Sequence, residues 1–402
     1  MPGNALAITS GSTPPRPFQH LDERADRWDG LTLDGTQRAS SPSRRPSPEA
    51  RYDRPMTVYF MAPDRTGPVG GIRVIYGMVR ALEEAGIKSA VWQNDAEAVG
   101  WALSLRAPVI FGKSLELTRG DRLVVPEATA PSWREINEEL PVIVLNQGHY
   151  NTLGGASPSA DVSGPYPLWR GVSAVVATSE AITDFLNELC LGVPVFSVRL
   201  WTDVMEDAPP SGERELLVSF MVNRPTSAPY SIMNAVRRDA AFSAWRWNAI
   251  VDLPPAAVRQ TLGRSAVFFH GGQREGFGLP ALEAMAAGAY LIGFTGDGAR
   301  ELMRSDLCTI LPDDNLAAAV RLTKQALSSP GMRAERAQAA RAWVASSYGW
   351  SQFVSRCAKI FAGLPTTSTI EVPSQAIHVS HMEARRPNLR RRLGLARDAL
   401  LR

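Results

Sequence analysis

The sequence predicts an α/β protein with two domains, each built on a parallel sheet that helices cover on both faces. Short apolar runs typical of buried strands alternate with amphipathic helical segments over most of the 402 residues. Two glycine-rich turns follow two neighbouring strands late in the chain. Residues 203–214 are polar and contain Pro209-Pro210, which indicates a linker between two such series of elements.

Composition excludes several classes of protein. No apolar run approaches the ~20 residues needed to span a bilayer, and the N-terminus lacks a basic-then-apolar signal pattern, so we expect a cytoplasmic location. The three cysteines are far apart and form no Cys-x-x-Cys pair, which favours reduced thiols over a disulfide or a zinc site. The net charge of +3 is too small to indicate a nucleic-acid partner.

Both ends of the chain read as tails. Residues 1–55 are rich in Pro, Ser, Gly and charge and have no lasting hydrophobic period, which predicts a disordered N-terminal tail. Residues 365–402 are polar and then basic, with seven arginines after Glu383. This tail is either a solvated basic end or a peripheral attachment to the anionic inner face of a membrane.

The first domain is expected at residues 56–205. It opens with the buried strand 57–62, a loop that ends in Gly70-Gly71, and a helix that Gly86 stops. A helix over 179–190 has Ser179 as its N-cap. Further strands are expected at 91–92, 108–111, 122–125, 142–145, 172–178 and 195–200.

The second domain is expected at residues 206–364. Its strands are predicted at 215–221, within 244–251, at 265–269 and at 289–294. Helices are predicted at 254–263, 278–288, 315–328, 333–346 and 350–364. The segment AWRWNA (244–249) is either core or a sugar-stacking surface, and core packing is the simpler interpretation.

The strongest functional signal is the segment EGFGLPALE, from Glu275 to Glu283. Gly276 and Gly278 let backbone approach a ligand closely, and Pro280 suits the first turn of a helix. The N-terminus of that helix favours phosphate, because its N–H groups are unpaired and its dipole end is positive. The segment therefore predicts a diphosphate site flanked by acids that accept hydrogen bonds from sugar hydroxyls. A glycine-rich loop before an ordinary helix is the alternative.

These residues resemble the paired-glutamate motif of retaining glycosyltransferases, particularly family 4 (group 1). Weaker similarities extend over about residues 56–362: Gly70-Gly71 before a helix, Thr178-Ser179-Glu180, and Tyr348-Gly349-Trp350-Ser351. The resemblance implies the GT-B fold, in which two Rossmann-like domains face each other across a cleft. It also implies that a sugar moves from a nucleotide-diphosphate sugar to a glycan, lipid-linked or small-molecule acceptor.

The resemblance also implies residue roles. Glu275 would contact the donor sugar and act in catalysis, and Glu283 would hold the ribose of the nucleotide. The backbone amides of four residues would cradle the donor: Gly276, Phe277, Gly278 and Leu279. Gly70 and Gly71 would border the donor from the first domain, where the acceptor docks. The nucleotide sugar is a co-substrate, so no cofactor is expected.

Two further residues carry open interpretations. In SFMVNRPTSAPYS, Arg224 is the only basic residue where the family has an Arg and a Lys. It is either a bidentate phosphate ligand or an exposed loop arginine, and Arg237 or Arg238 would substitute for the missing lysine. His149 follows a predicted strand, where the family often places a histidine near the donor sugar. The alternative for His149 is a loop histidine bonded to backbone.

No Asp-x-Asp motif occurs in the chain, so we expect no metal in the reaction, with helix ends and arginine supplying the positive charge. Two other functions fit the same sequence. One is a non-catalytic GT-B module that binds a nucleotide sugar or a protein partner. The other is a sugar-nucleotide epimerase on the same fold.

Overall fold

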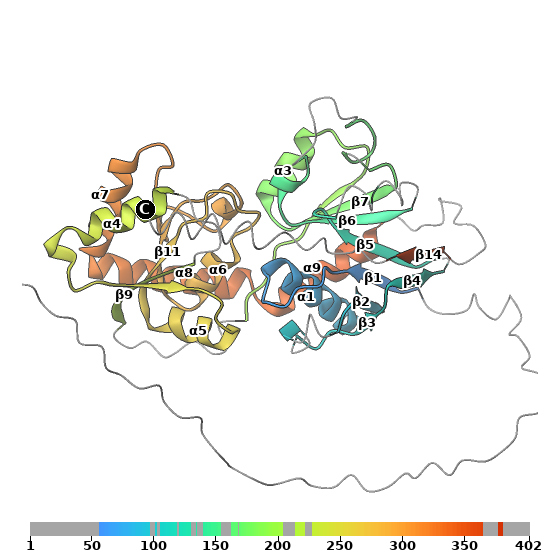
Figure 1. Ribbon diagram of the computed structural model, residues 1–402, viewed down its shortest axis with the longest axis horizontal. Helices are drawn as coiled ribbons and strands as arrows, with labels where there is room; N and C mark the ends of the chain where they lie inside the picture. The colour runs from blue at the N-terminus through green and yellow to red at the C-terminus, as the bar shows by residue number, and fades with distance from the viewer. Residues whose placement is uncertain are drawn as a thin grey trace, which may run out of the picture. The chain divides into compact units, whose positions relative to one another are not determined.

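Two parallel sheets organise the described part of the chain, as the sequence predicts (Figure 1). The computed structural model describes residues 56–96, 101–102, 105–118, 120–129, 134, 140–153, 162–167, 169–203, 214–221, 227–364 and 377–380. The first sheet has seven strands in the order β3-β2-β1-β5-β6-β7-β8. The second sheet has five, in the order β10-β9-β11-β12-β13. All strand pairs within these two sheets are parallel.

The first series of elements follows the predicted order. Its strands are β1 (Val58–Met61), β2 (Ser89–Gln93), β3 (Val109–Phe111), β4 (Ser114–Leu117), β5 (Arg122–Pro126), β6 (Val142–Asn146), β7 (Val172–Ala177) and β8 (Val195–Ser197). Its helices are α1 (Gly70–Glu84), α3 (Glu180–Glu188) and the short 3-10 helix η3 (His149–Asn151).

The second series alternates in the same way. Its strands are β9 (Glu215–Met221), β10 (Arg246–Ile250), β11 (Ser265–His270), β12 (Tyr290–Gly293) and β13 (Thr309–Ile310). Its helices are α4 (Ser227–Arg237), α5 (Pro255–Arg264), α6 (Leu279–Ala286), α7 (Leu316–Leu327), α8 (Pro330–Ser347) and α9 (Trp350–Gly363), with the 3-10 turns η4 (Ala240–Phe242) and η5 (Gly298–Glu301).

The strands of the first sheet read as continuous apolar runs because both faces of the sheet are covered. Side chains of β1 alternate between two core clusters: Val58 and Phe60 lie in one, and Tyr59 and Met61 lie in the other. All four side chains are almost fully buried. The same alternation explains why a strict polar–apolar pattern is absent from these strands.

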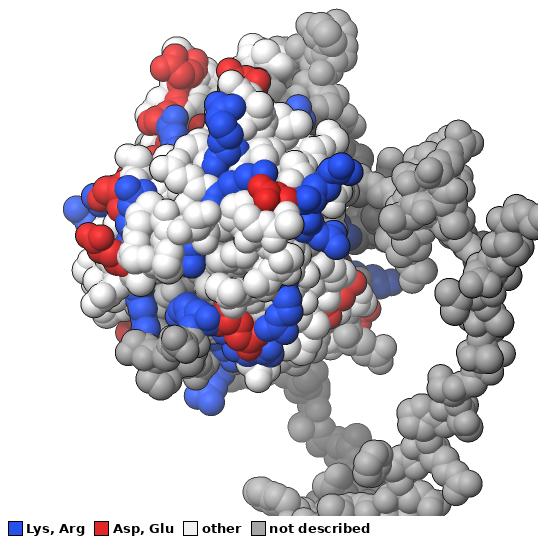
Figure 2. All heavy atoms as spheres, turned by 90° about the vertical axis from the view of Figure 1, so that its left-hand side faces the viewer, with Lys and Arg blue, Asp and Glu red and all other residues white. Residues whose placement is uncertain are grey.

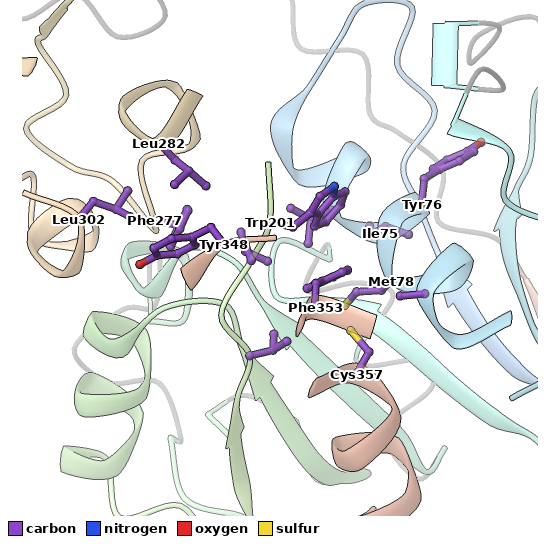
Figure 3. Packing of buried hydrophobic residues seen from close by; sticks show 14 of the residues in the cluster. Ile75, Tyr76, Met78, Trp201, Phe277, Leu282, Leu302, Tyr348, Phe353 and Cys357 are labelled. Atoms are coloured by element: carbon purple, nitrogen blue, oxygen red, sulfur yellow. The ribbon is translucent and has the colours of Figure 1, made fainter. Parts of the chain in front are cut away.

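The last helix, α9, packs against the first sheet rather than the second. Phe361 lies 5.5 Å from Phe60 between ring centroids, and Arg122 on β5 donates to the Phe361 carbonyl at 2.6 Å. Phe353 stacks on Trp201 at 4.4 Å, and Figure 3 shows this pair beside Met78 of α1. The predicted domain ranges stay a prediction, but α9, inside the range 206–364, belongs by packing to the first sheet.

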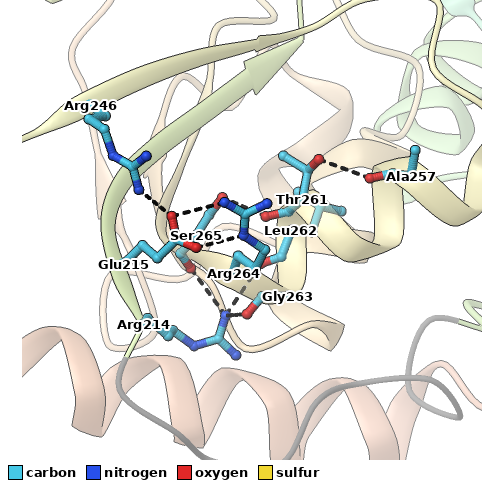
Figure 4. Close-up of polar contacts among 9 residues, drawn as sticks. All are labelled: Arg214, Glu215, Arg246, Ala257, Thr261, Leu262, Gly263, Arg264 and Ser265. Atoms are coloured by element: carbon cyan, nitrogen blue, oxygen red, sulfur yellow. Dashed lines mark hydrogen bonds and ion pairs between the residues drawn. The ribbon is translucent and has the colours of Figure 1, made fainter.

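The segment that enters the second sheet is held by arginines (Figure 4). Arg214 donates to the carbonyls of Gly263 at 2.8 Å and Ser265 at 3.1 Å. Arg264 donates to the Glu215 carboxylate at 2.6 Å, and Arg246 pairs with the same carboxylate. These bonds fix the start of β9 beside β10 and β11, because each arginine reaches across from a neighbouring element.

One element of the C-terminal region was not predicted. Residues Ile377–Ser380 form β14, which pairs antiparallel with β4. The predicted tail 365–402 is otherwise outside the described residues, as is the predicted tail 1–55. In the described part of the chain, no helix combines the length and apolar character that crossing a membrane requires.

Candidate functional site

The paired-glutamate turn lies where β11 runs into α6. The strand ends at His270, and α6 begins at Leu279 after Gly278, whose φ of 92° is left-handed. A Cβ on Gly276 would come within 1.9 Å of the Gln147 carbonyl oxygen, and one on Gly278 within 2.8 Å of the Ala299 Cβ. Both glycines are therefore required: Gly276 by the close approach of the first domain's backbone, Gly278 by its conformation.

The second glycine-rich turn lies directly against the first. The Glu275 amide donates to the Gly296 carbonyl at 2.8 Å, and the Gly298 amide donates to the Glu275 carbonyl at 3.1 Å. Glu275 and Asp297 thus form an isolated parallel bridge beyond the ends of β11 and β12. The prediction that both turns meet at one edge of the sheet is correct, because adjacent parallel strands end on the same side.

Glu283 projects from α6 and is engaged by the first domain. Its carboxylate pairs with Arg73, which lies near the start of α1 and also lies 3.2 Å from Asp203. Burial by itself would lower the pKa of Arg73, but the two carboxylates outweigh it and raise that pKa. The carboxylate predicted to hold ribose is therefore oriented by a cation that the sequence reasoning missed. Arg73 follows Gly70-Gly71 closely, which is the signal that would have found it.

His149 begins η3, directly after the loop that follows β6. Its side chain is 5% exposed, and its Nε2 lies 2.9 Å from Asp297 Oδ2 in the second turn. Tyr150 and Phe185 contact the imidazole ring at centroid distances of 4.2 Å and 5.7 Å. Burial lowers the pKa of His149, while Asp297 opposes that shift. The structure thus brings His149 to the second turn, and its role near the donor stays a prediction.

The glycine pair of the first domain lies close to the same turn, Gly70 directly and Gly71 beside Gln147. A Cβ on Gly70 would lie 3.0 Å from Leu279 Cδ1, and one on Gly71 would lie 3.3 Å from the Gln147 side chain. The pair forms the first two residues of α1 rather than a loop. Small residues here let the N-terminus of α1 approach the turn that opens α6.

The remaining predicted residues divide into two groups. The Phe277 side chain is buried and lies 6.1 Å from Tyr348 between ring centroids (Figure 3), and the role of its backbone amide at the donor stays a prediction. Arg224 lies outside the described residues, and its phosphate role stays a prediction. Arg237 ends α4.

The weaker motifs also meet at this junction. Ser179 accepts a hydrogen bond from the Ile182 amide at 3.2 Å as the N-cap of α3, and its hydroxyl donates to the Gly276 carbonyl at 2.6 Å. The Tyr348 hydroxyl donates to Glu301 at 3.4 Å. Ser179 thus contacts the turn that carries Glu275, whereas Tyr348 contacts η5, which follows the second turn.

Asp297 and Tyr150 also lie at the site, beside His149, and the sequence did not predict them. Asp297 stands between two glycines in TGDG, a position where a side chain is unusual, and this was the available signal. Tyr150 is exposed and stacks with the Arg274 guanidinium at 5.9 Å. Among the described residues, no group of three or more His, Cys, Asp or Glu is placed to hold a metal ion.

Comparisons with known proteins agree with this geometry. The family model "Glycosyl transferases group 1" matches residues 249–343, which include both glycine turns. An alpha-1,6-glucosyltransferase of Actinobacillus pleuropneumoniae is 25% identical over 250 residues, covering 60% of this chain and 73% of the relative.

Solved structures share the architecture. TarM of S. aureus, crystallised with UDP and a GlcNAc-glycerol, has a TM-score of 0.57 at 9% identity and covers 76% of this chain and 99% of its own. HepE of Anabaena, crystallised with UDP, has a TM-score of 0.57 at 10% identity and covers 77% of this chain and all of its own. At such identities the likeness establishes the fold. That fold is GT-B, and the family model and the related glucosyltransferase support a glycosyltransferase similar to those of group 1.

Proposed function

We propose that this chain is a retaining, family 4-type glycosyltransferase that transfers a hexose from a nucleotide-diphosphate sugar without a metal ion. One observation carries the proposal: Glu275 and Glu283 bracket a glycine turn that opens α6, and His149 and Arg73 reach that turn from the first domain. Two acids, a helix N-terminus and two facing side chains form a site with separate positions for a sugar, a diphosphate and a ribose.

The diphosphate would lie at the N-terminus of α6. Backbone amides of Gly276 to Leu279 supply donors there, and the helix dipole favours negative charge. Arg224 would add a bidentate contact. Such preorganised donors stabilise the charge that grows on the leaving diphosphate, so the proposal requires neither a metal nor a cofactor.

The sugar and the ribose would take the two carboxylates. Glu275 would accept a hydrogen bond from a hydroxyl of the donor sugar, and Glu283 would accept from the ribose hydroxyls. UDP-glucose is the first donor to test, because HepE was crystallised with UDP-glucose and the related enzyme from Actinobacillus is a glucosyltransferase.

The acceptor would dock on the first domain near Gly70, Gly71 and His149. In the reaction, the bond from the sugar to the diphosphate breaks, and a bond to the acceptor oxygen forms on the same face. The acceptor proton leaves with the diphosphate oxygen. Glycan, lipid-linked and small-molecule acceptors all fit this scheme, and TarM carries a GlcNAc-glycerol in its crystals.

The test measures nucleotide release and the anomeric configuration of the product. Purified protein receives UDP-, GDP-, dTDP- and ADP-linked sugars with an acceptor panel, and Glu275→Gln should lower kcat by about 100-fold or more. Glu335→Gln, an exposed glutamate on α8, is the matched control and should leave kcat unchanged.

Four outcomes would overturn the proposal. Full activity in Glu275→Gln would remove the assigned role of that carboxylate. An inverted anomer would exclude retention. Donor binding without turnover would favour a non-catalytic GT-B module, and an altered free sugar nucleotide would favour an epimerase.

A further inference from the structure

Asp297 occupies a strained backbone position in the second glycine turn. Its φ of 66° and ψ of −62° place it at the centre of a γ-turn, which the hydrogen bond from the Gly298 amide to the Gly296 carbonyl closes at 2.9 Å. This form of γ-turn is rare and strained for any residue other than glycine. A glycine would relieve the strain, so the aspartate side chain needs a separate explanation.

The Asp297 carboxylate contacts two cationic or ionisable groups. One oxygen lies 2.9 Å from His149 Nε2, in the first domain. The other lies 3.5 Å from Arg300 Nη1, three residues along the chain. The backbone of Asp297 is bridged to Glu275. The same residue thus links the two side chains that the proposed function places at the donor sugar.

The imidazole of His149 has one nitrogen left for a ligand. Tyr150 and Phe185 hold the ring. Among the described residues, both ring nitrogens are buried and neither makes a well-aligned hydrogen bond. Nε2 is the nitrogen that lies 2.9 Å from Asp297 Oδ2, so the carboxylate can hold a proton there, whereas Nδ1 has no carboxylate beside it. If Nε2 carries the proton toward Asp297, Nδ1 presents a lone pair, because a neutral imidazole has one donor and one acceptor nitrogen.

We propose that Asp297 is a positioning residue that fixes the orientation and tautomer of His149, so that Nδ1 accepts a hydrogen bond from a hydroxyl of the donor sugar. The role at the sugar rests on the proposed function, whereas the Asp297–His149 coupling does not. The strain at Asp297 is kept because a glycine at this position would leave Nε2 without its carboxylate.

The coupling is tested by NMR titration of the His149 imidazole, identified as the signal absent from His149→Gln. Two charged groups act on this imidazole, and they act in opposite directions: Asp297 raises its pKa and Arg300 lowers it. We therefore expect Asp297→Gly to lower the pKa of His149 further and Arg300→Gln to raise it. An unchanged pKa in Asp297→Gly would overturn the proposal.

Strain and chemistry are separated by comparing Asp297→Gly with Asp297→Ala. Alanine keeps the strained φ and removes the carboxylate, whereas glycine removes both, so the glycine variant should have the higher Tm. Asp252, exposed and at φ 47°, gives the matched pair Asp252→Gly and Asp252→Ala for stability alone. Both Asp297 variants should lose kcat/KM equally, by about tenfold or more, despite their different Tm values. Activity that follows Tm would show that the residue is only structural.

A double-mutant cycle completes the test. If Asp297 acts through His149, then Asp297→Gly should add little loss in a His149→Gln background, and the two losses should be non-additive by about tenfold. Fully additive losses would contradict the proposal. If the chain shows no transfer at all, the proposed function fails, but the NMR titration and the Tm comparison still decide whether Asp297 and His149 are coupled.

Discussion

At the scale of single residues, burial fixes the protonation state of the histidine that ends β11. His270 is 3% exposed, and its Nε2 has no hydrogen-bond partner among the described residues. Burial lowers the pKa of His270 from 6.5 to about 4. The ring is therefore neutral at physiological pH, and it supports the glutamate turn as an uncharged core residue.

This pKa predicts a loss of stability in acid. The unfolded chain binds the proton at about pH 6.5, and the folded chain binds it only near pH 4. The free energy of unfolding is therefore unaffected by His270 above pH 6.5. It decreases as the pH falls from 6.5 toward 4, by about 3 kcal/mol in total. Urea unfolding of the wild type and of His270→Gln between pH 7 and 4 measures it. The free energy of unfolding should decrease less with falling pH in the variant than in the wild type. Equal pH dependences in the two proteins would contradict the burial argument.

Residue identity at the site was only partly readable from the sequence. Glu275, Glu283 and the glycines stood out because their types and spacing match a chemical need. Arg73 and Asp203 did not, because Arg73 pairs with Glu283 and with Asp203, which lie 210 and 130 residues away in the sequence. Contacts of that kind depend on how the two domains meet, which no local pattern encodes.

At the scale of elements, the close approach of two loops sets the site. The Gly276 backbone lies against the Gln147 carbonyl, so Gly276→Ala would force a Cβ to within 1.9 Å of it. The loop that carries His149 must then move, because the obstacle is backbone. We expect a loss of about 1–3 kcal/mol of stability and a fall in transfer of tenfold or more.

The control for Gly276→Ala is Gly331→Ala on α8, where a Cβ would meet nothing within 4 Å. Because glycine is a poor helix former, this change should raise stability by up to about 1 kcal/mol. Thermal unfolding and nucleotide-release assays of both variants check the pair. Equal changes of stability and of nucleotide release in the two variants would contradict the close contact between Gly276 and the Gln147 carbonyl.

A second contact joins α1 to α9 through Trp201. A Cβ on Gly77 would lie 1.8 Å from the Trp201 ring, and the same ring stacks on Phe353 (Figure 3). Gly77→Ala should therefore cost about 1–3 kcal/mol by overpacking. Trp201→Phe in the Gly77→Ala background should recover part of that loss in a denaturant titration. No recovery would show that the ring is not the obstacle.

The sequence predicts the order of helices and strands well, but it predicts less well which strand or sheet each of them packs against. Strands such as β1 and β6 are buried apolar runs, and their alternation with helices specifies parallel pairing. The sequence missed β4 and β14, because each has only four residues and their antiparallel pairing joins segments far apart in the chain. It also left α9 with the second domain, since helical periodicity reveals a face to bury but not the sheet that covers it.

At the scale of the whole molecule, the net charge is small, although seven arginines gather after Glu383. Basic and acidic side chains are interspersed on the face drawn in Figure 2, and the net charge is +3. The proposed function therefore relies on the glycine turns and the side chains around them, and it does not require a large net charge. The GT-B architecture brings α1, η3 and α6 to those turns from opposite domains.

The most direct test of that account is a crystal structure with a nucleoside diphosphate bound. We expect the diphosphate at the amides between Gly276 and Leu279 and the ribose hydroxyls on Glu283. Arg73 should remain paired with that carboxylate, and Glu275 should face the vacant sugar position. A nucleotide bound elsewhere, with no phosphate at the N-terminus of α6, would contradict the central claim.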